Sequence, residues 1–116
     1  GSIVLFSSVA AGTGFNFHSL VSSSKGAIEG LVKALSAELA PSVRINAIAL
    51  SITDTPLAAK LLNSPEKKAF NEKRHPLNAI GDPADIASLV GFLLSSKSKW
   101  ITGQVITADG GISAIK

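Results

Sequence analysis

Two residues that could take part in chemistry stand near the first helical pattern of the chain. Lys25 follows three serines near the start of residues 19–39, and Ser8 follows a short apolar run. An ammonium lowers the pKa of a neighbouring acid, and ligands of open α/β folds sit at strand carboxyl ends. The alternatives are an exposed helix lysine and a serine that only turns the chain. Histidine is a residue type that often serves as an acid or base, but we expect His18 to be a surface or packing histidine rather than a catalytic one.

Composition narrows the classes of partner. Of the 116 residues, 46% are hydrophobic and 16% charged, so some apolar faces are expected to meet a partner rather than water. The net charge of +3 is dispersed, and residues 67–74 form a basic run that we interpret as a solvated helix face rather than an anion-binding patch. We therefore expect no nucleic-acid partner.

The absence of cysteine and the hydropathy pattern argue against disulfides, thiolate metal sites and membrane-spanning segments. The chain has no Cys, which excludes disulfides and thiolate metal sites, and no metal site is predicted. No run approaches the ~20 apolar residues that span a bilayer, and no signal peptide is recognised. We expect no membrane partner and a cytoplasmic location.

Alternating strand and helix patterns position the candidate residues. Short apolar runs predict strands at residues 3–6, 43–49 and 105–108. Residues 19–39 form the longest helical pattern, with five apolar positions on one face: Ile28, Leu31, Val32, Leu35 and Leu39. Further helices are predicted at residues 57–62, from Pro65, and from Asp82–Pro83, where Asp82 is the expected N-cap. Residues 9–18, 51–56 and 75–81 are predicted loops.

This order of elements predicts an α/β fold. Strands separated by helical crossovers favour a parallel sheet with right-handed connections, and three strands leave at least one edge bare. Asp109-Gly110-Gly111 is expected to be structural, ending the last strand and turning the chain. Trp100 is expected to be a packed anchor rather than a cofactor platform.

Six segments together carry a family resemblance. They are, in order, SIVLFSS, SSSKGAIEGLVKALSAELAP, VRINAIA, SITDTPL, GDPADIASLVGFLLS and WITGQVITADGG. At these spacings the chain resembles the short-chain dehydrogenase/reductases over essentially its whole length. The resemblance implies the C-terminal part of a Rossmann-like doubly wound parallel sheet, about three parallel strands with flanking helices. Residues 1–116 would then be a single incomplete domain.

The resemblance also implies a missing half. In the family, a nucleotide-binding half with a Gly-rich phosphate-binding turn and an Asn-rich motif precedes this region. Gly12-Thr13-Gly14 is not that turn, because it leads into no phosphate-cradling helix start. We therefore expect the C-terminal half of such an enzyme, as a truncated product, a proteolytic fragment or one chain of a split protein.

The family's catalytic pattern carries over onto two positions and fails at a third. Ser8 matches the serine that orients the substrate oxygen, and Lys25 matches the lysine that lowers the tyrosine pKa and holds the nicotinamide ribose. The proton-transferring tyrosine should stand four residues before the lysine, where this chain has Val21. The chain contains no Tyr, so the resemblance implies that the central acid/base group is absent.

The segment after the second predicted strand implies a cofactor contact. Ile52, Thr53 and Thr55 match the family pattern that contacts the nicotinamide carboxamide of NAD or NADP. The preceding Leu50-Ser51 departs from the family's Pro-Gly, which puts the backbone conformation in doubt. The alternative is that Asp54-Thr55-Pro56 merely starts a helix.

Three functions follow from these observations. The first is an NAD(P)-dependent oxidoreductase fragment acting on a small carbonyl or alcohol, inactive as this chain alone. The second is a pseudo-enzyme remnant without hydride transfer. The third is an interaction module, because the small residues of 19–39 suit close helix packing. A homo-oligomer is expected through this helix or through the exposed first strand.

Overall fold

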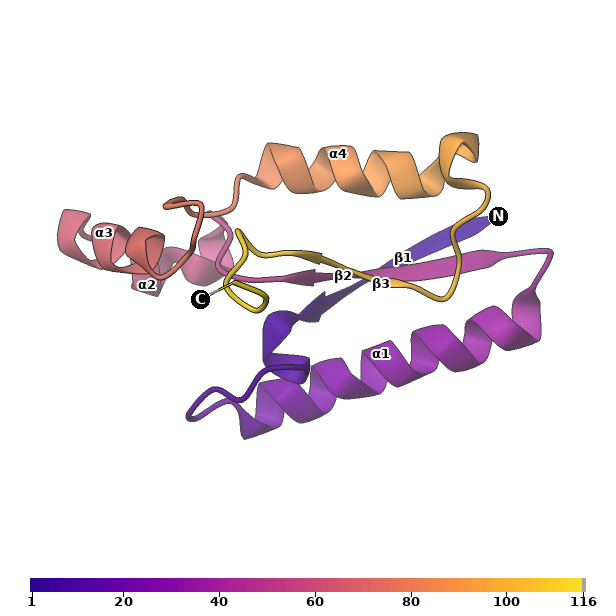
Figure 1. Ribbon diagram of the computed structural model, residues 1–116, viewed down its shortest axis with the longest axis horizontal. Helices are drawn as coiled ribbons and strands as arrows, with labels where there is room; N and C mark the ends of the chain where they lie inside the picture. Colours follow the sequence, from indigo (N-terminus) through magenta and orange to yellow (C-terminus); the bar gives the residue numbers. More distant parts are fainter. Residues whose placement is uncertain (116) are drawn as a thin grey trace.

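The computed structural model describes residues 1–115, which form three layers (Figure 1). The middle layer is a parallel sheet of β1 (Ser2–Ser8), β2 (Arg44–Leu50) and β3 (Val105–Ala108), in the order β1-β2-β3. Ser8 pairs with Leu50, and Leu50 pairs with Ala108, so the three strands end together at one edge. The predicted α/β class and parallel sheet are confirmed, and the first two strands differ from prediction by one or two residues at their ends.

Helices lie on both faces of the sheet. α1 (Ser19–Leu39) covers one face and α4 (Pro83–Leu94) the other, as Figure 1 shows. Near the carboxyl ends of the strands lie the short helices α2 (Ala59–Leu62) and α3 (Pro65–Lys73). Single 3₁₀ turns complete the set: η1 (Val9–Ala11), η2 (Pro56–Ala58) and η3 (Ser96–Ser98).

The predicted helix starts depend on capping side chains. The Asp82 carboxylate accepts a hydrogen bond from the Ala84 N–H at 2.9 Å, and Pro83 follows at a position that needs no donor. Ser64 caps α3 in the same way, through its hydroxyl oxygen and the Lys67 N–H at 3.1 Å. Local sequence therefore fixes both of these starts.

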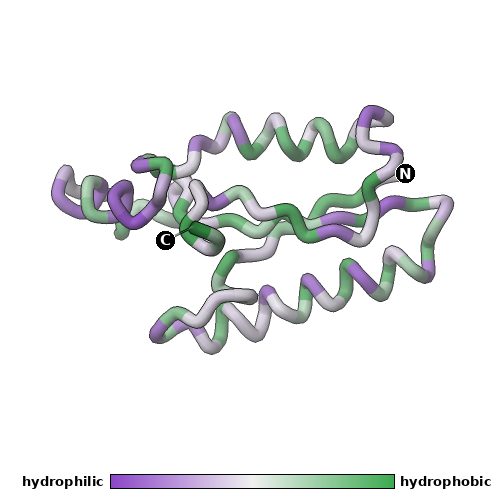
Figure 2. The backbone as a smooth tube through the Cα atoms, in the orientation of Figure 1, coloured by the Kyte–Doolittle hydropathy of each residue, from purple (hydrophilic) through white to green (hydrophobic). Residues whose placement is uncertain are grey.

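The core gathers around β2. Ile45 and Ala47 are fully buried against Val32 of α1, with partly buried side chains around them from β1, α1, β3 and the turn before β2: Leu5, Leu35, Val43 and Val105. Figure 2 shows hydrophobic positions along the strands and hydrophilic ones concentrated over α3. A strand buried on both faces suits a central parallel strand.

The apolar face of α1 is narrower than its spacing predicts. Val32 is buried, but Leu31 and Leu39 remain 47% and 38% exposed. They lie toward the margins of the stripe, where the three-stranded sheet is too narrow to cover them. The five apolar positions share one side of the helix as predicted, but the sheet leaves these two leucines partly exposed.

Polar side chains close the amino-terminal edge of the sheet. The Arg44 guanidinium donates to the carbonyls of Ser95, Ser98 and Ile101 and to the Ser98 hydroxyl, at 2.9–3.3 Å. The fully buried Asn46 donates to the Ile101 carbonyl and accepts from the Gln104 N–H, each at 3.1 Å. These bonds tie β2 to the segment that leads into β3.

Trp100 does not pack as expected. Its side chain is 97% exposed, although it adjoins the segment that Arg44 and Asn46 hold. The packed-anchor prediction is wrong, because backbone carbonyls rather than the indole fix this segment. Among residues 1–115, no helix is both long and apolar enough to cross a membrane.

Candidate active-site edge of the sheet

Ser8 lies at the carboxyl end of β1, where ligands of open α/β sheets sit. Its half-buried hydroxyl oxygen accepts a hydrogen bond from the Ala10 N–H at 3.1 Å and caps η1. The neighbouring Ser7 is buried and donates to the Glu29 carboxylate of α1. Since successive strand side chains alternate in direction, Ser8 points away from α1. Ser8 therefore does help to turn the chain, which was the alternative to a catalytic role. Its position at the end of β1 also allows it to contact a bound ligand.

Lys25 is brought to the same edge by α1. The half-buried side chain donates from Nζ to the Phe6 carbonyl at 3.3 Å, two residues before Ser8 on β1. An ammonium has three donors, so two N–H groups remain for other acceptors. The geometry is therefore not that of a helix lysine pointing into solvent.

Val21 stands one helical turn before Lys25, on the same side of α1. Its side chain is 44% exposed and is hydrocarbon only, so it has no proton to transfer. The neighbouring Ser22 and Ser23 hydroxyls do not supply the missing proton donor, because both are already used within the protein. Ser22 donates to the Ala10 carbonyl at 2.8 Å, and Ser23 donates to the Ser19 carbonyl at 2.7 Å.

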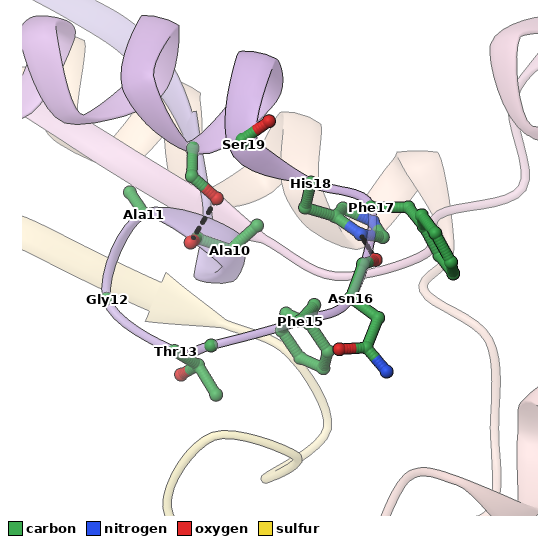
Figure 3. Close-up of a pocket in the computed structure, with 11 residues that line it drawn as sticks. Ala10, Ala11, Gly12, Thr13, Phe15, Asn16, Phe17, His18 and Ser19 are labelled. Carbon is green, nitrogen blue, oxygen red and sulfur yellow. Dashed lines mark hydrogen bonds between the residues drawn. The ribbon is translucent and has the colours of Figure 1, made fainter.

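The loop before α1 encloses an open pocket of ≈ 510 Å³, lined by residues 10–19 and Ser22 (Figure 3). His18 lies at its rim, exposed, with Nδ1 2.6 Å from the Asn16 carbonyl and its ring 5.7 Å from that of Phe15. Val21 and Lys25 do not line this pocket. His18 therefore behaves as the surface residue that was expected.

The segment after β2 is fixed by Gly81. Thr53 pairs with Gly81 in a parallel bridge, and the Gly81 N–H donates to the Ile52 carbonyl at 3.0 Å. The buried Thr53 hydroxyl donates to the Ser51 carbonyl at 3.2 Å, which commits it within the protein. Thr55 is extended and precedes η2, so the backbone does start a helix at Pro56. A contact to the nicotinamide carboxamide would therefore come from the backbone of this segment or from the Thr55 side chain.

Sequence reasoning gave no role to His75, which is only 2% exposed. Its Nε2 lies 2.8 Å from the Ser51 hydroxyl, and its Nδ1 lies 2.7 Å from the Asn71 carbonyl. In the sequence, Ser51 was notable only because Leu50-Ser51 stands where the family has Pro-Gly. Spacing could not have paired it with His75, because α2 and α3 separate the two residues.

Asp109 directly follows the last residue of β3 and lies near His75 at the carboxyl edge of the sheet. Burial raises the pKa of its carboxyl, but hydrogen bonds from Ser113 and Gly111 and the nearby His75 outweigh burial and lower it below the usual value. The Asp109 oxygens accept from the Gly111 N–H at 2.9 Å and from the Ser113 N–H at 3.0 Å. Gly110 and Gly111 both have positive φ, at 62° and 91°, which L side chains rarely adopt. The structural role expected for this turn agrees with these contacts.

Metal ligands do not gather in this region. Within residues 1–115, no three His, Asp or Glu side chains converge on a point where they could hold a metal ion. A parallel sheet covered by helices on both faces, with polar side chains at its carboxyl edge, defines a Rossmann-like α/β protein.

Comparison with known proteins gives the family. A family model described as enoyl-(acyl carrier protein) reductase matches residues 1–113. A tropinone reductase homologue of Arabidopsis thaliana is 39% identical over 114 residues, which are 97% of this chain and 37% of that protein. The structure of ElxO with NADP bound is 34% identical with a TM-score of 0.88, covering 97% of this chain and 46% of that one. For 4-hydroxyisoleucine dehydrogenase complexed with NADH the identity is 28% and the TM-score 0.92, covering 100% and 48%.

The chain belongs to the short-chain dehydrogenase/reductase family of oxidoreductases, which its motifs had indicated. Two of these solved relatives hold NADP and NADH, respectively. The chain spans less than half the length of the curated relatives that it matches.

Proposed function

We propose that the chain forms the substrate-side half of an NAD(P)-dependent oxidoreductase site for a small carbonyl or alcohol, and that Val21 leaves it without hydride-transfer activity on its own. One observation carries the proposal: the Lys25 Nζ donates to the Phe6 carbonyl at 3.3 Å, two residues before Ser8 on β1. An ammonium and a hydroxyl near the carboxyl ends of the strands support the proposal, because ligands of open α/β sheets bind at that edge.

The residues divide the chemistry as follows. Ser8 orients the substrate oxygen, and the two free N–H groups of Lys25 hold the nicotinamide ribose. Bound NAD(P) supplies or accepts the hydride. The proton needs a group with a suitable pKa one turn before Lys25, and the isopropyl group of Val21 provides none. The expected loss is roughly the 10²–10⁴-fold credited to positioned acid/base groups.

Cofactor affinity is expected to be low for the 116 residues alone. They contain no Gly-rich turn for the pyrophosphate, and the Thr53 hydroxyl is already committed to Ser51. Ile52, Thr55 and Lys25 remain as contacts to the nicotinamide end. In a fluorescence titration with NADH and NADPH, we expect no saturation, and saturable binding would contradict this part of the proposal.

A chimera tests the site itself. The amino-terminal half of the Arabidopsis tropinone reductase homologue, joined to this chain, would restore a complete subunit. We expect NADPH-dependent reduction of small ketones by the Val21→Tyr chimera at a rate at least ~10² times that of the Val21 form. Val21→Phe is the matched control, because it adds the ring without the hydroxyl. Equal rates for the Tyr and Phe variants, with cofactor bound equally, would refute the assigned site.

A non-catalytic role is the second candidate, supported by the outer surface of α1. Gly26 and Gly30 are exposed, and a methyl group added at either would meet no atom within 4 Å. A helix surface of small residues accepts another helix at short range. In this alternative the chain is a remnant that keeps its association surface, and a homo-oligomer forms through α1 or through the free edge of β1.

A further inference from the structure

Ser51 and His75 form a pair of side chains that the proposed oxidoreductase chemistry does not use. Ser51 follows the last residue of β2, and His75 follows α3. The Ser51 Oγ lies 2.8 Å from the His75 Nε2, within the range of a nucleophile and its base. His75 is 2% exposed, whereas Ser51 is only half-buried. The ring is therefore shielded from water while the hydroxyl remains within reach.

The surroundings of His75 assign its tautomer. Nδ1 lies 2.7 Å from the Asn71 carbonyl, which can only accept, so Nδ1 carries the proton. The Nε2 lone pair then faces the Ser51 hydroxyl, which donates to it. A neutral imidazole oriented by a third group is the arrangement that activates a serine.

The support behind the ring is itself fixed. Asn71 is buried, and its side-chain amide donates to the carbonyls of Leu61 and Lys67, each at 3.0 Å. On the other side, a methyl group at Gly110 would come within 3.2 Å of the His75 Cβ, so the backbone packs closely against the imidazole. Little freedom remains for the ring to turn away from Ser51.

The Asp109 carboxylate is an acidic group near this pair. His75 is one of the groups that lower the pKa of the Asp109 carboxyl, together with the hydrogen bonds that the carboxylate accepts from Gly111 and Ser113. A carboxylate in this neighbourhood is electrostatically compatible with transfer of the Ser51 proton to the ring.

We propose that Ser51 is an activated nucleophile that accepts an acyl group from a small activated ester, with His75 as its base. The Ser51 Oγ forms a bond to the ester carbonyl carbon, and the bond from that carbon to the leaving oxygen breaks. The Ser51 proton passes to His75 Nε2, and the leaving aryl oxide takes the bonding electron pair. His75 then passes the proton to the departing aryl oxide, which leaves as a phenol, and the ring returns to its starting form. The reaction needs no NAD(P), so it is independent of the oxidoreductase proposal.

None of the other serines described at this edge is paired with an imidazole. Ser7 donates to the Glu29 carboxylate, Ser8 accepts from a backbone N–H, and Ser22 and Ser23 donate to carbonyls. His18 has the same Nδ1 contact to a carbonyl as His75, but within residues 1–115 no serine hydroxyl bonds to its Nε2. Ser23 and His18, which have no part in the proposed oxidoreductase site, are therefore the matched controls.

The test is acetylation of the full chain with p-nitrophenyl acetate, followed by peptide mapping. We expect one hydroxylamine-labile acetyl group on Ser51, whereas acetyl groups on lysine resist hydroxylamine. Ser51→Ala should abolish it, and His75→Gln should slow it at least ~10²-fold. Ser23→Ala and His18→Gln should leave its rate unchanged.

Two results would overturn the proposal: no ester on Ser51, or an acetylation rate that His75→Gln leaves unchanged. If His75→Gln fails to fold, the pH dependence of the unmodified chain decides. A rate that falls through a single ionisation as pH drops supports a single titrating base such as His75. A rate that rises in proportion to hydroxide throughout would refute it.

Discussion

At the scale of the residue, the Arg44 side chain alone connects several segments of the chain by hydrogen bonds. It lies in the central strand, yet its guanidinium reaches four acceptors in the turn after α4 and the segment before β3. A planar fork with five donors can satisfy several carbonyls at once, whereas an ammonium cannot match that geometry. The cost of removing it comes from carbonyls left unpaired as well as from the lost bonds.

Replacement of Arg44 should therefore be destabilising. We expect Arg44→Met to lower the free energy of unfolding by about 1.5–3 kcal/mol, measured by urea denaturation. Arg44→Lys should recover only part of the loss. Lys68→Met, on the exposed surface of α3, is the control and should change the stability by less than ~0.5 kcal/mol. Equal losses of stability in Arg44→Met and Lys68→Met would contradict the role of Arg44 in joining β2 to the segment before β3.

Asp109 predicts a pH dependence of stability. The hydrogen bonds of the turn and His75 lower the carboxyl pKa in the folded state below its value of about 3.9 in an unfolded chain. Its contribution is present above the unfolded pKa and is lost as pH falls through the folded one. The stability difference between wild type and Asp109→Asn should thus be largest near neutral pH and shrink below about pH 4. Urea midpoints across this range measure it, with the exposed Asp54→Asn as control.

The sequence predicted some of these residues and not others, for a physical reason. Lys25 and Val21 lie on one helix, so their relation follows from helical spacing. Arg44, Ser51 and His75 gain their partners through tertiary contacts across long separations, which no local spacing encodes. The same limit explains the wrong expectation for Trp100, whose large apolar surface favours burial only where neighbours cover it.

At the scale of the element, the bridge between Thr53 and Gly81 joins two loops at the carboxyl edge. A methyl group at Gly81 would come within 2.9 Å of the Thr53 Oγ1 and 3.3 Å of the Ile52 carbonyl. The first separation is shorter than real contacts allow, so one loop must move. Helix and strand positions followed from capping residues and apolar periodicity, whereas this loop contact did not.

Two glycine substitutions should act in opposite directions. Gly81→Ala is expected to destabilise the chain and displace residues 52–54, because the added methyl group meets backbone and a buried side chain. Gly91→Ala lies inside α4, where a methyl group meets nothing within 4 Å, and should stabilise by about 0.5–1 kcal/mol. Thermal unfolding of both variants gives the comparison. A stabilising Gly81→Ala would show that the loop is looser than the contacts indicate.

At the scale of the whole molecule, the sheet has an unpaired side. Within residues 1–115, β1 pairs with β2 alone, and its Ile3 and Phe6 side chains are 42% and 44% exposed. The outer surface of α1 adds exposed small residues and Leu31. Two surfaces are thus available for association, and composition had already indicated that some apolar faces need a partner.

One variant separates the two modes of association. We expect wild type to be dimeric or larger in light scattering, and Ala34→Arg, on the exposed side of α1, to give monomers if α1 forms the contact. An oligomer that survives Ala34→Arg would assign the contact to the β1 edge. A monodisperse wild-type monomer would contradict the proposed association altogether.

The strand order has a consequence for biosynthesis. β2 is the middle strand, but residues 51–104 must leave the ribosome before β3 exists to cover its second side. Until then the strand that becomes the most buried one has one uncovered backbone edge, and Arg44 and Asn46 have no acceptors from the later segment. Translation speed through this stretch therefore sets how long chaperones can capture the emerging polypeptide before the sheet is sealed.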